Sequence, residues 1–567
     1  MENYQNYKKM YDWKKPKSRK WVEKELLEAP IWCSVDLRDG NQALPNPMTL
    51  GQKITFFKYL VEIGFKDIEI GFPAASETEY NLTRYLIDNN LIPDDVKIQV
   101  LTQSRAEIIE KTFKALEGVK NAVVHLYNST SELQRRVVFN KSKEEVTEIA
   151  ATGAKMIVEY MKKYPETNWT FEYSPESFTG TEIDYAIDVI NEVTKIWLPV
   201  VKNKPIINLP STVENSTPNI FADQVEYVCD NLQNRKDIII SIHAHNDRGT
   251  AVATTELAIL AGADRVEGTL FGNGERTGNA DILNLGMNMY TLGVNPLLDF
   301  SNIKEMKDKY EELTEMEVGV RHPYAGDLVF TAFSGSHQDA IAKGMKYRKD
   351  NSIEIWEVPY LPVNPEDIGR AYEPVIRINS QSGKGGVAYI LETDFGYIIP
   401  RGLKKEIGYF IKNISDNKKR ELEANEILEA FDKEYINRKE KLKIIDYEIN
   451  KISEKKNKLT IILEKTRAFT KEANGNGPID ALSKILHELG YSFEFETYTQ
   501  HSLEQQGSNA KAISYISIKV GKKCIWGIGR SGDITKSALK ALVSAINRME
   551  GIYYGNDNDT KNISKSC

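Results

Sequence analysis

Two histidines separated by one alanine, His243 and His245, are the residues whose spacing most directly indicates metal binding. They end an apolar run, and residues i and i+2 of a strand point to the same side. The whole chain has seven histidines, so two at this spacing are notable; a chance pair in the core or on the surface is the alternative interpretation. Asp39, which follows an earlier apolar run, can add a carboxylate to the pair.

Two imidazoles and one carboxylate leave positions open on a divalent cation, which a bidentate 2-oxo acid would fill. Mixed nitrogen and oxygen ligands suit Mg²⁺, Mn²⁺ or Zn²⁺. The same ligands also suit the Fe(II) of a non-haem oxygenase, and that interpretation stays open at this point.

Arg38 stands directly before Asp39 and would share a strand face with Asp36. A guanidinium beside a bound ketone would stabilise the alkoxide that forms when a carbon nucleophile attacks. The structural alternative is an ion pair between Arg38 and Asp36 at the end of the strand.

Two glycine-rich segments come close to nucleotide-binding motifs without matching them. In Phe271–Asn279 the third glycine falls one residue late for the dinucleotide fingerprint, so we interpret it as backbone that approaches a ligand or metal closely. Ser382–Gly386 lacks the spacing of a phosphate-binding Walker loop and predicts a turn.

A repeating pattern between about residues 30 and 300 must position these groups. Short β-branched apolar runs alternate there with amphipathic stretches typical of helices. Eight such units favour an α/β fold, a (β/α)8 TIM barrel, with an open doubly wound sheet as the alternative. Polar residues end most of the runs, and barrel enzymes place their active sites at the C-terminal ends of the strands. The expected strands are Trp32–Arg38, Asp67–Pro73, Lys97–Gln103, Asn121–Asn128, Trp169–Pro175, Ile206–Thr212, Asp237–His245 and Ala263–Leu270.

The pattern changes after the eighth unit, and four parts are expected: an N-terminal arm (1–30), the barrel (31–308), helical linker subdomains (309–440) and a small α+β domain (441–567). The charged stretch Asp416–Lys458 predicts a solvated connecting helix. The last part contains two similar sets of strand-like runs and an amphipathic helix, which predicts an internal duplication. It lacks a cluster of catalytic residue types, which favours a regulatory role.

Composition and charge narrow the function classes. A chain of 567 residues with 41% hydrophobic and 27% charged residues is typical of a folded protein of several domains. The net charge of −7 without a large basic block argues against a nucleic-acid partner. Four widely spaced cysteines argue for a reducing compartment. Without a membrane-spanning run or a signal sequence, we expect a cytoplasmic protein that is not membrane-bound.

Three motifs resemble the signatures of the barrel enzymes that condense or cleave acyl-CoA thioesters and 2-oxo acids. They are Asp36–Gln42, His243–Asp247 and Gly272–Asn279. Ser334–Asp339 and Asn379–Gly386 resemble the linker subdomains of the longer form of the 2-isopropylmalate synthase family, and Gly475–Pro478 with the duplicated terminal segment resembles its leucine-sensing domain. The resemblance covers nearly the whole chain beyond the N-terminal arm.

The resemblance implies a condensation of acetyl-CoA with 2-oxoisovalerate, followed by thioester hydrolysis to 2-isopropylmalate and CoA, with leucine as a feedback inhibitor. It implies that Asp39, His243 and His245 hold the divalent metal, with Asn279 as a further ligand or a partner of one. Mg²⁺ is the first choice, and Mn²⁺ or Zn²⁺ are the alternatives.

The resemblance also implies roles for residues that bind the substrates. Arg38 would polarise the ketone, while Thr212 and Glu176 would position the 2-oxo acid. His337 and Tyr360 match residues near the acetyl-CoA methyl group, which the neighbouring subunit of a homodimer contributes in this family. As a hypothesis, His337 removes the methyl proton, directly or through water.

Four other functions remain to be separated from this one. Homocitrate and citramalate synthases share the barrel motifs and differ in the 2-oxo acid. An Fe(II) oxygenase would use the same ligands, and a lyase would run the carbon–carbon step in reverse. A non-catalytic leucine sensor would not need to keep the residues Arg38, Asp39, His243, His245 and His337.

Overall fold

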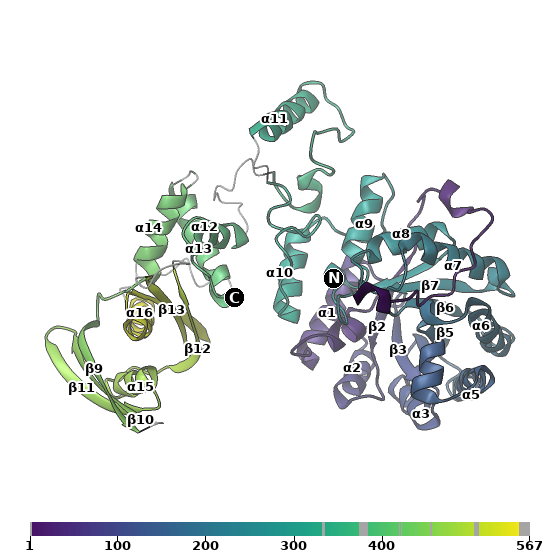
Figure 1. Cartoon of the computed structure of the whole chain (residues 1–567), viewed down its shortest axis with the longest axis horizontal. Helices are drawn as coiled ribbons and strands as arrows, with labels where there is room; N and C mark the ends of the chain where they lie inside the picture. The colour runs from purple at the N-terminus through teal and green to yellow at the C-terminus, as the bar shows by residue number, and fades with distance from the viewer. Residues whose placement is uncertain are drawn as a thin grey trace. The chain divides into compact units, whose positions relative to one another are not determined.

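The computed structural model describes residues 3–331, 335–372, 384–418, 420, 422–453, 456–503 and 510–554. Two compact units make up the chain, each described below by itself (Figure 1). One comprises Met1–Phe330 with Asp339–Arg370, and the other comprises Thr331–Gln338 with Ala371–Cys567. None of the described helices combines the length and apolar character needed to cross a membrane.

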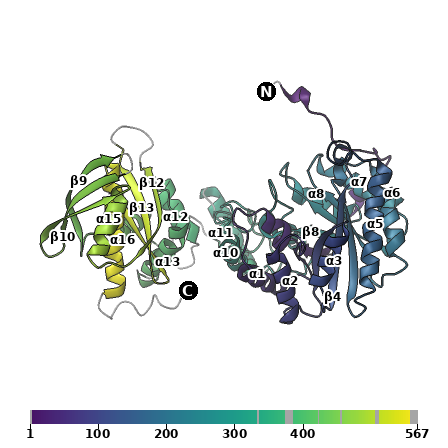
Figure 2. The same cartoon turned by 90° about the horizontal axis from the view of Figure 1, so that it is seen from below.

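The first unit is built on a closed barrel of eight parallel strands, in the order β1 to β8, which confirms the predicted TIM barrel over the open sheet (Figures 1 and 2). The strands are β1 Ile31–Ser34, β2 Asp67–Gly71, β3 Lys97–Gln103, β4 Asn121–Ser129, β5 Asn168–Glu176, β6 Ile206–Ser211, β7 Ile239–Ala244 and β8 Arg265–Gly268.

Helices follow the strands in alternation, and their starts are encoded locally. Thr49 and Ser142 each form a capping box with the residue three positions later, which satisfies free backbone N–H groups at the start of α1 and α5. The helices of this unit are α1 Leu50–Ile63, α2 Glu77–Asp88, α3 Ala106–Ala115, α4 Glu132–Gln134, α5 Lys143–Met161, α6 Ile183–Trp197, α7 Pro218–Asn231, α8 Ala251–Leu260, α9 Ile282–Thr291, α10 Ile303–Thr314 and α11 Gly335–Asp350, the last of which begins in the other unit.

The first strand is shorter than predicted, and the difference matters for the site. β1 ends at Ser34, and Asp36–Gly40 forms a π-helical turn instead of continuing to Arg38 as a strand. Such turns are rare and are found at functional sites. The turn carries Arg38 and Asp39 at the C-terminal end of the barrel, where both side chains are largely buried.

The N-terminal arm is anchored to the barrel by carboxylates of α7, chiefly by Asp223. Asp223, which is on α7 and 3% exposed, accepts hydrogen bonds from the indoles of Trp13 and Trp21, both at 3.0 Å. The guanidinium of Arg19 also donates to it, at 2.8 Å from Nε. Because three separate side chains of the arm converge on one buried carboxylate, this part of the arm is ordered against the barrel.

The second unit contains helices α12 Lys384–Thr393, α13 Arg401–Lys418 and α14 Ala424–Tyr435, followed by two antiparallel three-stranded sheets. Each sheet is followed in sequence by one helix. The order of three strands and then a helix therefore occurs twice. The elements are β9 Lys443–Ser453, β10 Lys456–Glu464, β11 Ala468–Gly475, α15 Pro478–Glu488, β12 Glu494–Ser502, β13 Ala512–Val520, β14 Lys523–Ser531 and α16 Ile534–Tyr554. The repeat supports the predicted duplication.

Two local predictions differ from the structure. The charged stretch Asp416–Lys458 was expected to be one helix, but it contains the end of α13, all of α14 and strand β9. Charged residues occupy the exposed faces of helices and strands alike, so charge density alone does not distinguish them. Ser382–Gly386 was expected to be a turn, but its described part begins α12 at Lys384, and Ser382 and Gly383 lie outside the described residues.

The boundary expected at residue 440, between the linker and the terminal domain, falls inside the second compact unit. Buried residues of α12 to α14, such as Leu391, Ile407 and Phe431, share one hydrophobic core with Tyr515 and Trp526 of the second sheet. Ala371–Tyr435 and that sheet therefore belong to the same compact unit. Most buried residues of this core lie between Val387 and Ile436, and Ile513, Tyr515, Trp526 and Ile528 of the sheet complete it.

Candidate metal and 2-oxo acid site

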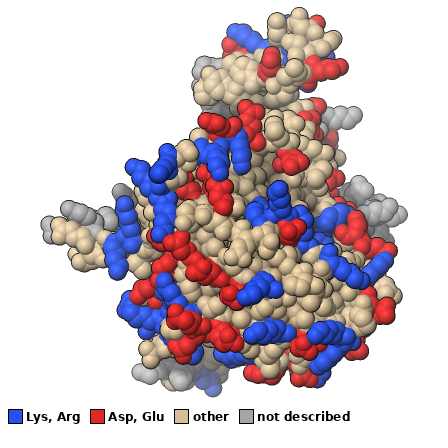
Figure 3. Space-filling model, turned by 90° about the vertical axis from the view of Figure 1, so that its right-hand side faces the viewer, with Lys and Arg blue, Asp and Glu red and all other residues tan. Residues whose placement is uncertain are grey.

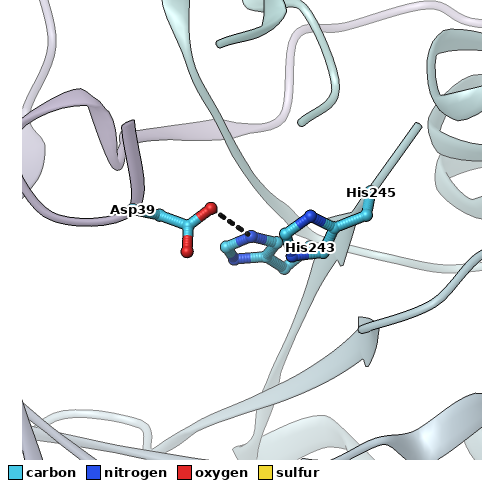
Figure 4. Close-up of side chains that lie close together, drawn as sticks. All are labelled: Asp39, His243 and His245. Atoms are coloured by element: carbon cyan, nitrogen blue, oxygen red, sulfur yellow. Dashed lines mark ion pairs between the residues drawn. The ribbon is translucent and has the colours of Figure 1, made fainter. Parts of the chain in front are cut away.

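Asp39, His243 and His245 converge at the C-terminal end of the barrel (Figure 4). One ligand atom of each residue lies within 4.8 Å of the others, and all three side chains are buried. The two imidazoles are stacked with centroids 5.1 Å apart, as their i, i+2 spacing at the end of β7 predicts. His243 Nε2 lies 3.8 Å from Asp39 Oδ2, across the pairing of β1, β8 and β7.

Asn279 lies against the same ligand atoms. Its amide Nδ2 donates to Asp39 Oδ2 at 2.6 Å, and its Oδ1 is 2.8 Å from His243 Nε2. Glycines make this approach feasible: a Cβ on Gly274, whose φ is 159°, would lie 2.2 Å from Asn279 Nδ2. Gly278 has a left-handed φ of 99° and a Cβ there would clash with a backbone oxygen. These contacts support the interpretation that the backbone of Phe271–Asn279 approaches the site closely.

Charges around the ligands set their protonation. Burial opposes ionisation of Asp39, but Arg38 and the hydrogen bond with His243 outweigh it and hold the pKa of Asp39 below its usual range. Burial, and after it the positive charge of the neighbouring His243, lower the pKa of His245 to about 4. Burial also opposes the charge on His243, yet Asp39 and Glu267 raise its pKa to about 10.

The residues present fit a divalent cation. His245 Nδ1 is buried and has no hydrogen-bond partner among the described residues, which is costly for a polar atom unless a ligand satisfies it. Asp39 is held ionised and His245 neutral, which are the forms that bind metals. Asp39, His243 and His245 would therefore hold the ion, and Asn279 Oδ1 is placed to assist them.

Metal affinity should increase with pH between about 7 and 10. The pKa of His243 is raised to about 10, so a proton occupies this ligand below that pH and must leave when a cation binds. Each unit of pH should increase the apparent affinity about tenfold, because one proton is released for each ion bound. His245, with a pKa lowered to about 4, is already neutral and adds no dependence.

A titration of Mn²⁺ against a competing chelator at pH 7, 8 and 9 would measure this slope. Calorimetry in two buffers of different ionisation enthalpy would count the released proton. An affinity that does not change over this range would show that His243 is not a protonated ligand in the free enzyme.

Arg38 pairs with Asp39 and Glu69, and not with Asp36 as the structural alternative proposed. Its Nη1 donates to Asp39 Oδ1 at 2.7 Å, and its Nε donates to Glu69 of β2. Asp36 instead accepts hydrogen bonds from Ser34 and the Leu270 backbone, and burial raises the pKa of Asp36 to about 7. The side chain of Arg38 is 14% exposed, so part of it remains accessible to a ligand at the barrel mouth.

The predicted substrate-positioning residues lie at the ends of neighbouring strands. Glu176 ends β5 and accepts a hydrogen bond from Ser129, while Thr212 follows β6 and its Oγ1 accepts from the Ser177 N–H at 2.9 Å. Both are therefore at the same rim of the barrel as the metal ligands. Their role in binding the 2-oxo acid stays a prediction.

The two residues expected near the acetyl-CoA methyl group lie in different compact units. His337 is exposed near the start of α11 and belongs to the second unit. Tyr360 belongs to the first unit, is 62% exposed and has a left-handed φ of 64°. Their catalytic roles likewise stay predictions.

Sequence reasoning gave no role to the polar residues directly below the site, Arg265, Gln99, Glu69 and Glu267. All four are fully buried inside the barrel. Arg265 and Glu267 could have indicated this buried cluster from the sequence. They are two charges at strand spacing in a short segment that is otherwise typical of a buried strand.

Three family models match successive parts of the chain. Residues 29–309 match the family model HMGL-like, residues 327–392 match "Alpha-isopropylmalate synthase, post-catalytic domain-like", and residues 421–550 match "LeuA allosteric (dimerisation) domain". Among solved structures, hydroxymethylglutaryl-CoA lyase from Pseudomonas aeruginosa covers 52% of this chain and 96% of its own, with a TM-score of 0.43 and 17% identity.

Similar curated proteins extend over nearly the full length. The 2-isopropylmalate synthase of Acetoanaerobium sticklandii is 56% identical over 565 residues, covering 99% of both chains. That of Clostridium acetobutylicum is 55% identical over 540 residues, covering 94% of this chain and 97% of its own. With this identity across the barrel, the linker and the terminal domain, the chain belongs to the 2-isopropylmalate synthase family.

Proposed function

We propose that this chain condenses acetyl-CoA with 2-oxoisovalerate (3-methyl-2-oxobutanoate) and hydrolyses the thioester, which yields 2-isopropylmalate and free CoA. It would thus be an acyltransferase that converts the acyl group into an alkyl group on transfer. The observation that carries the proposal is the buried set Asp39, His243 and His245 with Arg38 beside it, in a chain of this family.

A divalent cation held by these ligands, with Mg²⁺ as our first choice, supplies Lewis-acid polarisation of the 2-oxo acid. Arg38 donates a hydrogen bond to the ketone oxygen and stabilises the negative charge that develops on it. Glu176 and Thr212 orient the 2-oxo acid at the rim.

His337 takes one proton from the acetyl methyl group, and Tyr360 lines the same part of the acetyl-CoA site. The methyl carbon then forms a bond to the keto carbon, whose carbonyl electron pair moves to oxygen. Water cleaves the thioester, which releases CoA and leaves a second carboxylate. A neutral imidazole is a suitable acceptor for the methyl proton near pH 7.

We further propose that the terminal domain binds leucine as a feedback inhibitor and that the chain acts as a cytoplasmic homodimer in which one subunit completes the site of the other. The match of residues 421–550 to an allosteric dimerisation domain and the repeated sheets β9–β11 and β12–β14 support this. Leucine added to the full-length enzyme should lower the rate of CoA release, whereas valine at the same concentration should have a much smaller effect.

The reaction is tested by measuring the CoA thiol released from acetyl-CoA with 2-oxoisovalerate, pyruvate and 2-oxoglutarate offered separately, each with and without EDTA. We expect fast, EDTA-sensitive release with 2-oxoisovalerate. Release with pyruvate or 2-oxoglutarate alone would contradict the proposed substrate and indicate citramalate or homocitrate synthesis. The absence of release with any acid, after addition of Mg²⁺, Mn²⁺ or Zn²⁺, would contradict a condensing enzyme.

A further inference from the structure

The interior of the barrel below the candidate site is filled by charged and polar side chains. TIM barrels usually fill this space with layers of branched apolar residues. Here Arg265, which is fully buried, occupies the centre. It donates from Nε to Asp67 at 3.0 Å, from Nη1 to Glu267 at 2.6 Å and from Nη2 to Gln99 at 2.7 Å.

One arm of this network leads from Arg265 to the metal ligands. Glu267 accepts from Arg265 through Oε1, and its Oε2 lies 3.0 Å from His243 Nδ1. An ionised carboxylate can only accept, so Nδ1 carries the hydrogen and Nε2 is the nitrogen that faces Asp39. Carboxylates that hold a metal-binding imidazole in this way fix both its tautomer and its ring orientation.

The other arm leads from Arg265 to the arginine at the barrel mouth. Gln99 accepts from Arg265 through Oε1 and donates from Nε2 to Glu69 Oε2 at 2.6 Å. The other oxygen of Glu69 accepts from Nε of Arg38. The amide of Gln99 thus joins a cation to a carboxylate, and only a side chain with both a donor and an acceptor can do so.

The two arms begin on different nitrogens of the same guanidinium. Its rigid planar fork fixes the directions of both hydrogen bonds relative to each other. Removing charged groups from water is costly, and a buried ionic network is weak evidence for stability alone. A positional role explains why such a network lies directly under the site.

We propose that Arg265 is a positioning residue that aligns both parts of the site, His243 through Glu267 and Arg38 through Gln99 and Glu69. The consequence for turnover rests on the proposed condensation, whereas the consequence for metal binding does not. The two arms can therefore be tested separately, by changing the residue that links each arm to Arg265.

Glu267→Gln keeps the size of the side chain but cannot accept from both Arg265 and His243. We expect it to weaken Mn²⁺ binding about 10- to 100-fold, measured without substrate by titration against a competing chelator. Gln99→Met breaks the second arm and leaves the first. It should retain the Mn²⁺ affinity of the parent and lower kcat about 10-fold or more, with KM for acetyl-CoA little changed.

Thr170→Val is the matched control. Thr170 lies on β5 inside the barrel, two residues before Glu172, is 2% exposed, and its Oγ1 has no hydrogen-bond partner among the described residues. It should keep both Mn²⁺ affinity and kcat, and circular dichroism should show that all three variants are folded. Glu267→Gln and Gln99→Met are used in place of Arg265→Met, because removing the guanidinium would leave several buried carboxylates uncompensated.

A folded Glu267→Gln variant with unchanged Mn²⁺ affinity would overturn the proposal, and so would a Gln99→Met variant with unchanged kcat. Equal loss of Mn²⁺ binding in Thr170→Val would also overturn it, because any change in the core would then have the same effect. If the parent binds Mn²⁺ but releases no CoA, the proposed reaction has failed, and the Glu267→Gln titration still decides the positioning role.

Discussion

Replacing His243 with alanine should lower kcat for metal-dependent CoA release at least about 1000-fold, equivalent to about 4 kcal/mol of transition-state stabilisation. The variant would lose one of the three proposed metal ligands, while Asp39 and His245 would remain. Mn²⁺ affinity should fall more than about 100-fold, as measured by chelator competition. Steady-state assays across a range of Mn²⁺ concentrations would separate weaker binding from slower chemistry.

The fold should survive this substitution for a specific reason. When the imidazole is removed, Glu267 still accepts from Arg265 at 2.6 Å and from Ser241 at 3.2 Å, so its buried charge stays compensated. His487→Ala, on α15 of the second unit, is the matched control and should keep its kcat in the absence of leucine. Activity of His243→Ala equal to that of the control would eliminate the metal site assigned here.

Replacing Arg38 with lysine should lower kcat about 100- to 1000-fold and leave Mn²⁺ affinity nearly unchanged. Lysine keeps the positive charge, but a single ammonium cannot reproduce the fork that contacts Asp39 and Glu69 from two different nitrogens. The loss should therefore be in the chemical step. Comparing kcat, KM for 2-oxoisovalerate and Mn²⁺ affinity in the same preparation would show this.

Arg84→Lys is the control for this substitution, since Arg84 lies on α2 and donates to Asp88 and to backbone carbonyls. It should retain the kcat of the parent enzyme. If Arg38→Lys also kept its kcat, the charge alone would suffice, and hydrogen bonding from a planar guanidinium would not be part of the mechanism.

The sequence predicted the barrel well because its signals are local. Each strand is a short apolar run, and a helix follows it with its own cap, as at Thr49 and Ser142. The order of strands and helices can therefore be predicted without knowing which strands pair. The charged stretch through β9 was misjudged because its partly buried residues Ile444 and Tyr447 are three positions apart, a spacing that also suits a helix.

The sequence by itself also determined which residue types belong to the site. The parallel imidazoles of His243 and His245 follow from two-residue periodicity within one strand, and the glycines near Asn279 indicate close backbone approach without any knowledge of the partner. The position of Arg38 beside Asp39 indicated its role from the sequence, and family resemblance added the expected roles of Glu176 and Thr212.

Only the tertiary structure decided which of these groups meet and what holds them. Asp39 reaches His243 because β1 and β7 both pair with β8 and because a π-helical turn redirects the chain after Ser34. The contacts of Arg265 join strands from opposite ends of the barrel sequence, and its neighbours become neighbours only when the barrel closes. Local patterns report the face on which a side chain lies, whereas partners across a closed sheet depend on register and closure.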